Sequence, residues 1–136
     1  MPGSKIVDAW ALLAWLQNEQ PAAEHVRKAL TEAADGNLQL FMSWINAGEV
    51  YYMLARKQSP RIAEEFPARL PSLPIRLVPP TENDIIAAAR LKATRKLSYA
   101  DAFAAALTQR ESGRLLTGDP ELRALGDVLT IEWIGR

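Results

Sequence analysis

Short apolar runs with the character of β-strands alternate with longer segments of helical periodicity along the whole chain. The runs expected to form strands are residues 5–8, 38–43, 75–78, 114–117 and 129–133. Such alternation is typical of a parallel sheet covered by helices on both faces. Right-handed crossovers bring the carboxyl ends of all strands to one edge, where ligands of such sheets bind. The sequence therefore predicts an α/β fold, a three-layer sandwich with a central, mostly parallel sheet of about five strands flanked by helices.

Helical periodicity fills the segments between these strands. The helices expected from it are residues 9–16, 22–35, 44–57, 60–70, 81–94, 98–112 and 120–125. Proline or glycine at Pro21, Gly36 and Gly113 separates them from what precedes or follows. The 136 residues contain no internal repeat or linker and can bury one hydrophobic core, so residues 1–136 are expected to form a single domain.

Composition excludes several classes of function. The chain has 16 basic and 16 acidic residues, so contact with nucleic acid requires a local basic patch rather than a cationic surface. It has no cysteine, which excludes a disulfide framework and a thiolate zinc site. The single histidine, His25, lies in a helical pattern and is expected at the surface. The apolar run at residues 9–16 is too short to span a membrane, so a cytoplasmic protein is expected.

Residues 96–106 open a helix that carries one acid, Asp101, among small and apolar residues. The residues expected to form a buried stripe on this helix are Tyr99, Ala102, Phe103, Ala106 and Leu107. Asp101 lies about 200° around the helix from Tyr99 and should point away from that stripe. The alanines beside Asp101 keep its flank thin, so another part of the backbone can approach it.

Three other acids can meet Asp101 at the sheet edge. Asp8 and Asp119 follow predicted strands, and Glu49 lies in the second turn of a helix that begins directly after a strand. Because parallel strands end at one edge, all four carboxylates can converge on one crevice.

Three of these acids also have a purely structural explanation. Asp8 and Asp119 stand where N-caps are expected, and Asp119 is followed by a proline. Ser98 and Asp101 have the spacing of a capping box. Residues 81 and 84, a threonine and an aspartate, have the same spacing and are interpreted as a capping box only. Spacing alone therefore leaves both interpretations open.

Glu49 lies inside a helix and cannot cap it. Its neighbours at i±3 and i±4 include no basic residue, and Asn46 shares its face one turn earlier. An acid in such an apolar helix is costly unless a cation meets it. That cation is either a metal ion or a distant lysine or arginine.

A cluster of carboxylates repels itself, and some of its members bind protons unless a counter-ion is present. Because the candidate ligands are carboxylate oxygens and the chain has no cysteine, the site favours Mg²⁺ or Mn²⁺. Such a site suits hydrolysis of a phosphodiester, because the metal lowers the pKa of water and stabilises the leaving oxygen. Thr117, two residues before Asp119, has two interpretations. Its hydroxyl either holds a water molecule or a phosphate, or it only ends the strand.

Four short segments resemble the motifs of the PIN domain in their order and approximate spacing. They are residues 6–9 (IVDA), 46–50 (NAGEV), 97–102 (LSYADA) and 116–119 (LTGD). The chain is similar over nearly its whole length to VapC-type toxin ribonucleases of toxin–antitoxin pairs.

This resemblance implies endonucleolytic cleavage of RNA at an acidic site that binds Mg²⁺ or Mn²⁺. It also implies a homodimer and neutralisation by a small cognate antitoxin. The catalytic and metal-binding residues that it indicates are Asp8, Glu49, Asp101 and Asp119, with Asn46 and Thr117 as supporting residues.

Two residues depart from the family pattern. Trp10 stands where the family often has a small hydroxyl residue, and it either narrows the crevice or offers a stacking face for a base. Gly48 lies inside a helix, where glycine costs about 1 kcal/mol relative to alanine; close packing is one explanation for it.

Two groups of basic residues are candidates for contact with an RNA backbone or are simply solvated helix faces. The first group is Arg90, Lys92, Arg95 and Lys96, and the second is Arg56, Lys57 and Arg61. Aromatic residues that belong to the core, to a dimer surface or to an antitoxin groove are Trp15, Trp44, Tyr51 and Tyr52.

Two other classes of function remain as alternatives. A phosphoacceptor signalling domain also gathers acids at a sheet edge, but Asp8 lacks the adjacent acid, and no lysine follows the last strand. A non-catalytic α/β interaction module would use the four acids only to cap helices. A dinucleotide enzyme is disfavoured because no glycine-rich G-x-G-x-x-G segment follows the first strand.

Overall fold

A computed structural model describes residues 3–136. Within these residues the strands form one five-stranded sheet in the order β3-β2-β1-β4-β5. Every neighbouring pair is parallel. The strands are β1 (Gly3–Val7), β2 (Leu38–Ser43), β3 (Arg76–Val78), β4 (Arg114–Thr117) and β5 (Thr130–Trp133). The predicted α/β class and the parallel sheet are confirmed.

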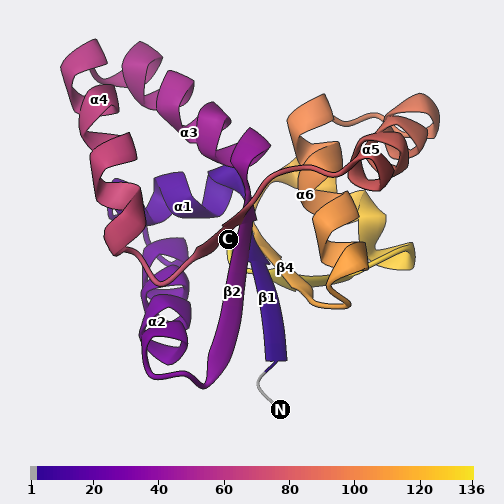
Figure 1. The fold of residues 1–136 in the computed structure, drawn as a ribbon, viewed down its shortest axis with the longest axis horizontal. Helices are drawn as coiled ribbons and strands as arrows, with labels where there is room; N and C mark the ends of the chain where they lie inside the picture. The colour runs from indigo at the N-terminus through magenta and orange to yellow at the C-terminus, as the bar shows by residue number, and fades with distance from the viewer. Residues whose placement is uncertain (1–2) are drawn as a thin grey trace.

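Helices cover both faces of this sheet. The α-helices are α1 (Ala9–Leu16), α2 (Ala22–Ala34), α3 (Trp44–Lys57), α4 (Pro60–Arg69), α5 (Glu82–Thr94), α6 (Tyr99–Arg110) and α7 (Pro120–Arg123). Two short 3₁₀ helices, η1 (Leu70–Ser72) and η2 (Ala124–Asp127), follow α4 and α7. Figure 1 shows α1 to α4 on one side of the strands and α5 and α6 on the other, which is the predicted three-layer arrangement.

Alternation along the strands builds a separate core on each face. In β1, Ile6 packs with the α6 side, and the next residue, Val7, packs with the α1 and α2 side. Leu115 and Leu116 divide in the same way in β4. Since successive side chains point to opposite faces, a run of apolar residues is what a strand buried on both faces requires.

The strand order reverses at β1. This strand pairs with β2 on one side and with β4 on the other. The crevice beyond the carboxyl ends of β1 and β4 is therefore the topological switch point of the sheet, the usual ligand-binding place in such folds. Asp8 directly follows β1, and Asp119 stands two residues after β4.

One prediction about α6 is wrong. Tyr99 is 45% exposed instead of buried, although it stacks on Phe103 with ring centroids 4.8 Å apart. Asp101, predicted to lie off the buried stripe on a thin flank that other backbone can approach, is 4% exposed. Residues 101–108 are all buried because α3 and α5 pack on the flanks of α6 while the sheet covers a third side. Tyr99, the first residue of α6, lies outside this buried part.

The described residues include no helix that combines the length and the apolar character needed to cross a membrane.

Candidate functional site

Asp8 is a buried carboxylate held by two hydrogen bonds. It is the N-cap of α1, and its Oδ1 accepts a hydrogen bond from the Ala11 amide at 2.8 Å. Its Oδ2 accepts a hydrogen bond from the hydroxyl of Thr117. Burial raises the pKa of Asp8 to about 7, in spite of these two bonds. Capping and membership of an acidic site are thus compatible for this residue.

Thr117 connects the ends of β1 and β4. Its hydroxyl donates to Asp8 and accepts a hydrogen bond from the backbone amide of Asp119 at 3.0 Å. Asp119 is in turn the N-cap of α7, where its Oδ1 accepts from the amide of Glu121 at 3.0 Å. One buried hydroxyl therefore sets the positions of two of the predicted acids relative to each other.

Asp101 does not complete a capping box. Its amide donates to the Ser98 hydroxyl at 3.1 Å, but its own Oδ2 is buried without a hydrogen-bond partner among the described residues. In the matched pair on α5, both bonds between Thr81 and Asp84 are present, as predicted. Burial, followed by the negative charge of nearby Asp119, raises the pKa of Asp101 to about 8.

Glu49 reaches the same place from α3. Its Oε1 is buried without a partner, and no lysine, arginine or histidine in residues 3–136 forms an ion pair with it. The alternative of a distant basic partner is therefore wrong for the part of the chain described. Burial raises the pKa of Glu49, the side chain of Asn46 opposes this shift, and the charges of Asp119 and Glu121 add to it.

Asn46 is fully buried and ties α3 to the start of α6. Its Nδ2 donates to the carbonyl oxygen of Ala100 at 3.0 Å, directly before Asp101 in the chain. Its Oδ1 is buried and has no partner within the described structure. Asn46 thus positions the backbone next to Asp101, and its side chain opposes the rise in the pKa of Glu49.

The predicted acids lie near one another, but the tightest cluster of carboxylates is not the predicted set of four. Single carboxylate oxygens of Asp101, Asp119 and Glu121 lie within 4.8 Å of one another. Glu121 was not predicted; its signal in the sequence is its place two residues after Asp119, in the first turn of the helix that Asp119 caps. Asp8 and Glu49 are close enough for their charges to act on Asp101.

A cavity of about 140 Å³ opens onto this cluster. Its lining residues are Ala9, Trp10, Leu13, Ala14, Gln17, Glu19, Glu49, Met53, Lys57, Asp101 and Asp119. Asp8, held by Ala11 and Thr117, lies outside this lining.

The donor set fits a hard divalent cation. In residues 3–136 none of the four predicted acids forms an ion pair with a basic side chain. Buried oxygens of Asp101 and Glu49 lack partners, and carboxylates are ligands that Mg²⁺ and Mn²⁺ prefer. Raised pKa values are the expected result of such a cluster without a counter-charge.

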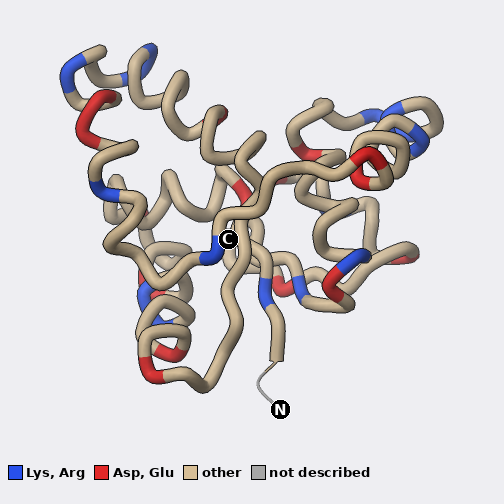
Figure 2. The backbone as a smooth tube through the Cα atoms, viewed as in Figure 1, with Lys and Arg blue, Asp and Glu red and all other residues tan. Residues whose placement is uncertain are grey.

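The two predicted basic groups lie apart from each other, as Figure 2 shows at the α3–α4 turn and at the end of α5. Arg95 forms an ion pair with Asp127 at 2.7 Å, so its charge is already partnered. Arg90 and Arg95 line a different depression from the acidic one. Lys57, from the second group, lines the acidic cavity itself.

A family model described as "PIN domain" matches residues 5–128. No curated protein matches the sequence.

Solved structures with a similar fold cover almost all of the chain. VapC20 of Mycobacterium tuberculosis, described as a Sarcin-Ricin loop cleaving toxin, has a TM-score of 0.70 and 21% identity, with 90% of this chain and 95% of that one covered. VapBC2 of Rickettsia felis, bound to a DNA fragment from its promoter, has a TM-score of 0.71 and 12% identity, with 96% of this chain and 98% of that one covered. DNA-bound VapBC of Salmonella typhimurium has a TM-score of 0.69 and 13% identity, with 98% of both chains covered. These similarities establish a shared fold.

Proposed function

The chain belongs to the PIN domain family, and from that premise we propose that it is a metal-dependent endoribonuclease that hydrolyses RNA phosphodiester bonds as the toxin of a toxin–antitoxin pair. The family membership and the fold shared with VapC toxins support this proposal. The similar protein VapC20 is described as a Sarcin-Ricin loop cleaving toxin.

One observation carries the proposal. Asp101 and Glu49, each with a buried and unpartnered carboxylate oxygen, line one cavity together with Asp119 at the topological switch point, and Glu121 lies close to Asp101 and Asp119. None of these acids has a basic partner in residues 3–136. Helix capping explains the hydrogen bonds of Asp8 and Asp119, but it gives no reason for the unpartnered oxygens. A divalent cation shared by these oxygens gives one.

Mg²⁺ or Mn²⁺ is the proposed cofactor, held by Asp101, Asp119 and Glu49 with Glu121 as an added candidate. When bound, such an ion supplies a Lewis acid that neutralises phosphate charge and acidifies water.

The side chains around these acids have positioning roles in this proposal. Thr117 holds Asp8 and the Asp119 amide, so it sets the separation of the two strand ends. Asn46 holds the first turn of α6. Asp8 contributes negative charge that acts on Asp101, and it keeps the hydroxyl of Thr117 oriented. Lys57, at the cavity wall, can contact an incoming phosphate.

Partners are proposed from the same premise. A similar structure from Klebsiella pneumoniae is described as a toxin-antitoxin complex, and we propose a small antitoxin as the cognate partner of this chain. We also propose a homodimeric state, which the resemblance to VapC-type toxins implies. Arg90, Lys92 and Lys96 are further proposed contacts for RNA, whereas Arg95 must first leave Asp127.

The test is Asp101→Asn, which removes a charge without changing the size of the side chain. RNA cleavage in Mn²⁺ or Mg²⁺ should fall at least about 100-fold, the scale of change seen when metal sites lose a supporting group. The circular dichroism spectrum should not change. Asp35→Asn is the matched control, because Asp35 is an exposed acid beyond the end of α2. Full activity of the Asp101 variant removes this residue from the mechanism.

Titration with Mn²⁺ separates the proposal from its rivals. A non-catalytic module with capping acids shows no saturable binding in calorimetry, whereas the proposed nuclease binds Mn²⁺ saturably and loses this binding in Asp101→Asn. A signalling domain accepts a phosphoryl group from a small phosphodonor, and we expect no such transfer here.

A further inference from the structure

Trp10 separates the acidic cavity from a second and larger one. It is the second residue of α1, two positions after Asp8. Its indole lines the 140 Å³ acidic cavity and also a neighbouring cavity of about 480 Å³. The residues that line the second cavity are Trp10, Glu19, Gln20, Pro21, Ala22, Gly135 and Arg136. Only Trp10 and Glu19 belong to both linings.

The indole is held against the backbone that carries the acids. A Cβ atom placed on Gly118 would lie 2.2 Å from Cη2 of Trp10, so residue 118 can only be glycine while the ring stays there. Gly118 is not in the left-handed region, and space rather than backbone freedom explains it. Because Gly118 joins Thr117 to Asp119, the ring position is fixed relative to the acidic cluster.

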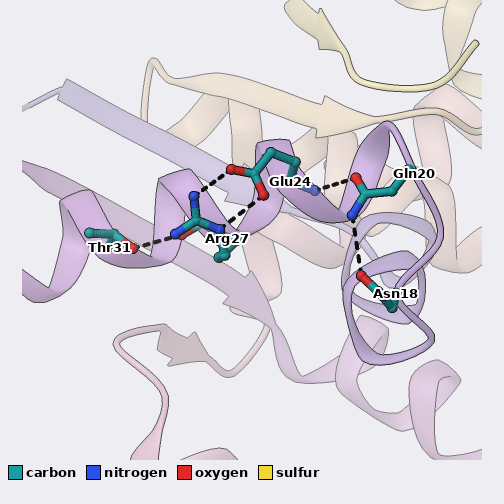
Figure 3. A network of polar contacts seen from close by, with 5 residues as sticks. All are labelled: Asn18, Gln20, Glu24, Arg27 and Thr31. Atoms are coloured by element: carbon teal, nitrogen blue, oxygen red, sulfur yellow. Dashed lines mark hydrogen bonds and ion pairs between the residues drawn. The ribbon is translucent and has the colours of Figure 1, made fainter.

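Gln20, which also lines the second cavity, belongs to a network of hydrogen bonds that Figure 3 shows at the turn between α1 and α2. The Gln20 side chain donates to Oδ1 of Asn18 at 3.2 Å and accepts from the Glu24 amide at 3.1 Å. Glu24 is paired with Arg27 one turn later. Contacts within the chain therefore hold both Trp10 and Gln20 in the lining of the second cavity.

We infer that Trp10 is a substrate-binding residue that stacks on the base of a nucleotide next to the scissile phosphate, with that base seated in the second cavity. This inference rests on the proposed nuclease function and adds the residue that holds the RNA strand. A flat aromatic wall stacks on any base and so suits single-stranded RNA. A cavity of about 480 Å³ lies in the size range of small-ligand sites and can hold one nucleotide.

The charges around the second cavity match this occupant. Arg136 lines it from the segment after β5, where Ile134 is anchored by donating its amide to the carbonyl of Thr117 at 3.0 Å. A guanidinium there can meet the phosphate on the far side of the seated nucleotide. Glu19, at the boundary of the two cavities, is an acceptor suited to the exocyclic amino group of a base.

The experiment is a cycle that combines protein variants with abasic RNA. Cleavage of a single-stranded oligonucleotide by the full chain in Mn²⁺ is compared for wild type, Trp10→Phe and Trp10→Leu. Leucine keeps an apolar contact without a ring, and phenylalanine keeps a ring. Each RNA is also made with an abasic nucleotide at one position flanking the cut. Ile86→Ala is the control, since Ile86 is 46% exposed and lines neither cavity.

We expect Trp10→Leu to raise KM about tenfold, the scale of one lost base stack. Trp10→Phe should recover most of that change, kcat should move little, and Ile86→Ala should behave as wild type. At one flanking position the abasic change should weaken wild type but have no further effect on Trp10→Leu, which identifies the stacked base.

Additive effects at every position, or an unchanged KM in Trp10→Leu, overturn the inference while the nuclease proposal stands. If wild type binds but does not cut the RNA, the same cycle is measured in Kd, and only the nuclease proposal fails. If wild type neither cuts nor binds RNA, both fail. Binding of a peptide in place of RNA, lost in Trp10→Leu, also overturns the inference.

Discussion

Asp84 and Asp101 occupy the same position in the first turns of α5 and α6, and their surroundings differ. The carboxylate of Asp84 accepts from the Thr81 amide at 2.9 Å and pairs with Arg110 at 2.9 Å. The carboxylate of Asp101 has an unpartnered buried oxygen and faces the charge of Asp119 instead. The first acid is neutralised within the chain, whereas the second needs a proton or a cation from solvent.

This difference predicts how stability without metal depends on pH. Folding raises the pKa of Asp8 to about 7 and of Asp101 to about 8, from 3.8. Between these values the folded state binds more protons than the unfolded state, so stability falls as pH rises. In EDTA the melting temperature should drop by about 3 °C or more between about pH 5 and pH 8.

Two comparisons check the origin of that drop. Asp101→Asn resembles the protonated acid, so in EDTA it should melt above wild type at pH 8 and close to it at pH 5. Saturating Mn²⁺ should raise the melting temperature of wild type more at pH 8 than at pH 5, because metal competes with protons for the carboxylates. A flat profile in EDTA contradicts the assignment.

Gly118 and Trp10 should be coupled in stability. A methyl group at Gly118 would collide with the indole of Trp10. We therefore predict that Gly118→Ala lowers the free energy of unfolding by about 1–3 kcal/mol in wild type, as overpacking does. In a Trp10→Leu background the same change should have a much smaller effect. Urea denaturation of the four proteins measures this, and equal effects in both backgrounds would show that the contact is unimportant.

At the scale of elements, one ion pair joins α5 to α6. Asp84 is 6% exposed, completes the capping box of α5 and receives Arg110 from the end of α6. Asp84→Ala removes the hydrogen bond to the Thr81 amide and the ion pair with Arg110. The partly buried guanidinium of Arg110 then has less negative charge near it. We predict a loss of about 1–3 kcal/mol in the free energy of unfolding. Asn83→Ala, an exposed change in the same turn, is the control and should alter stability little. An equal loss in both variants would assign the effect to helix propensity.

The elements themselves were predictable because their local signals agree. Each strand and α-helix begins and ends within two residues of its predicted limits. Local signals fail where packing decides: Tyr99 has the spacing of a buried residue but lies at the exposed end of α6. For the site, the sequence could place Asp8, Glu49 and Asp119 near one edge, since each lies shortly after the end of a strand or in the helix that follows it. It could not reveal Glu121, whose contact with Asp101 depends on how α7 turns after β4.

At the scale of the whole molecule, α3 presents an apolar face that the chain itself does not cover. Trp44 and Tyr52 are 48% and 43% exposed, and Gly48 lies between them on the same face. A Cβ atom at Gly48 would meet nothing within 4 Å, so close packing inside the described chain does not explain this glycine. We propose that a second copy of the chain approaches closely at this glycine, so that the contact of the proposed homodimer lies on α3.

The prediction is that Gly48→Arg prevents self-association and leaves the fold intact, because the residue is in open space within one chain. Gly48→Ala should instead raise the free energy of unfolding by about 0.5–1 kcal/mol, the usual effect in a helix interior. Gly126→Arg is the control, since a Cβ at Gly126 also meets nothing within 4 Å but lies in η2. Sedimentation velocity at matched concentrations should show a dimer for wild type and Gly126→Arg and a monomer for Gly48→Arg. A dimer in all three proteins would place the contact elsewhere. A monomeric wild type would contradict the homodimer and leave the exposed face of α3 without a second copy to cover it.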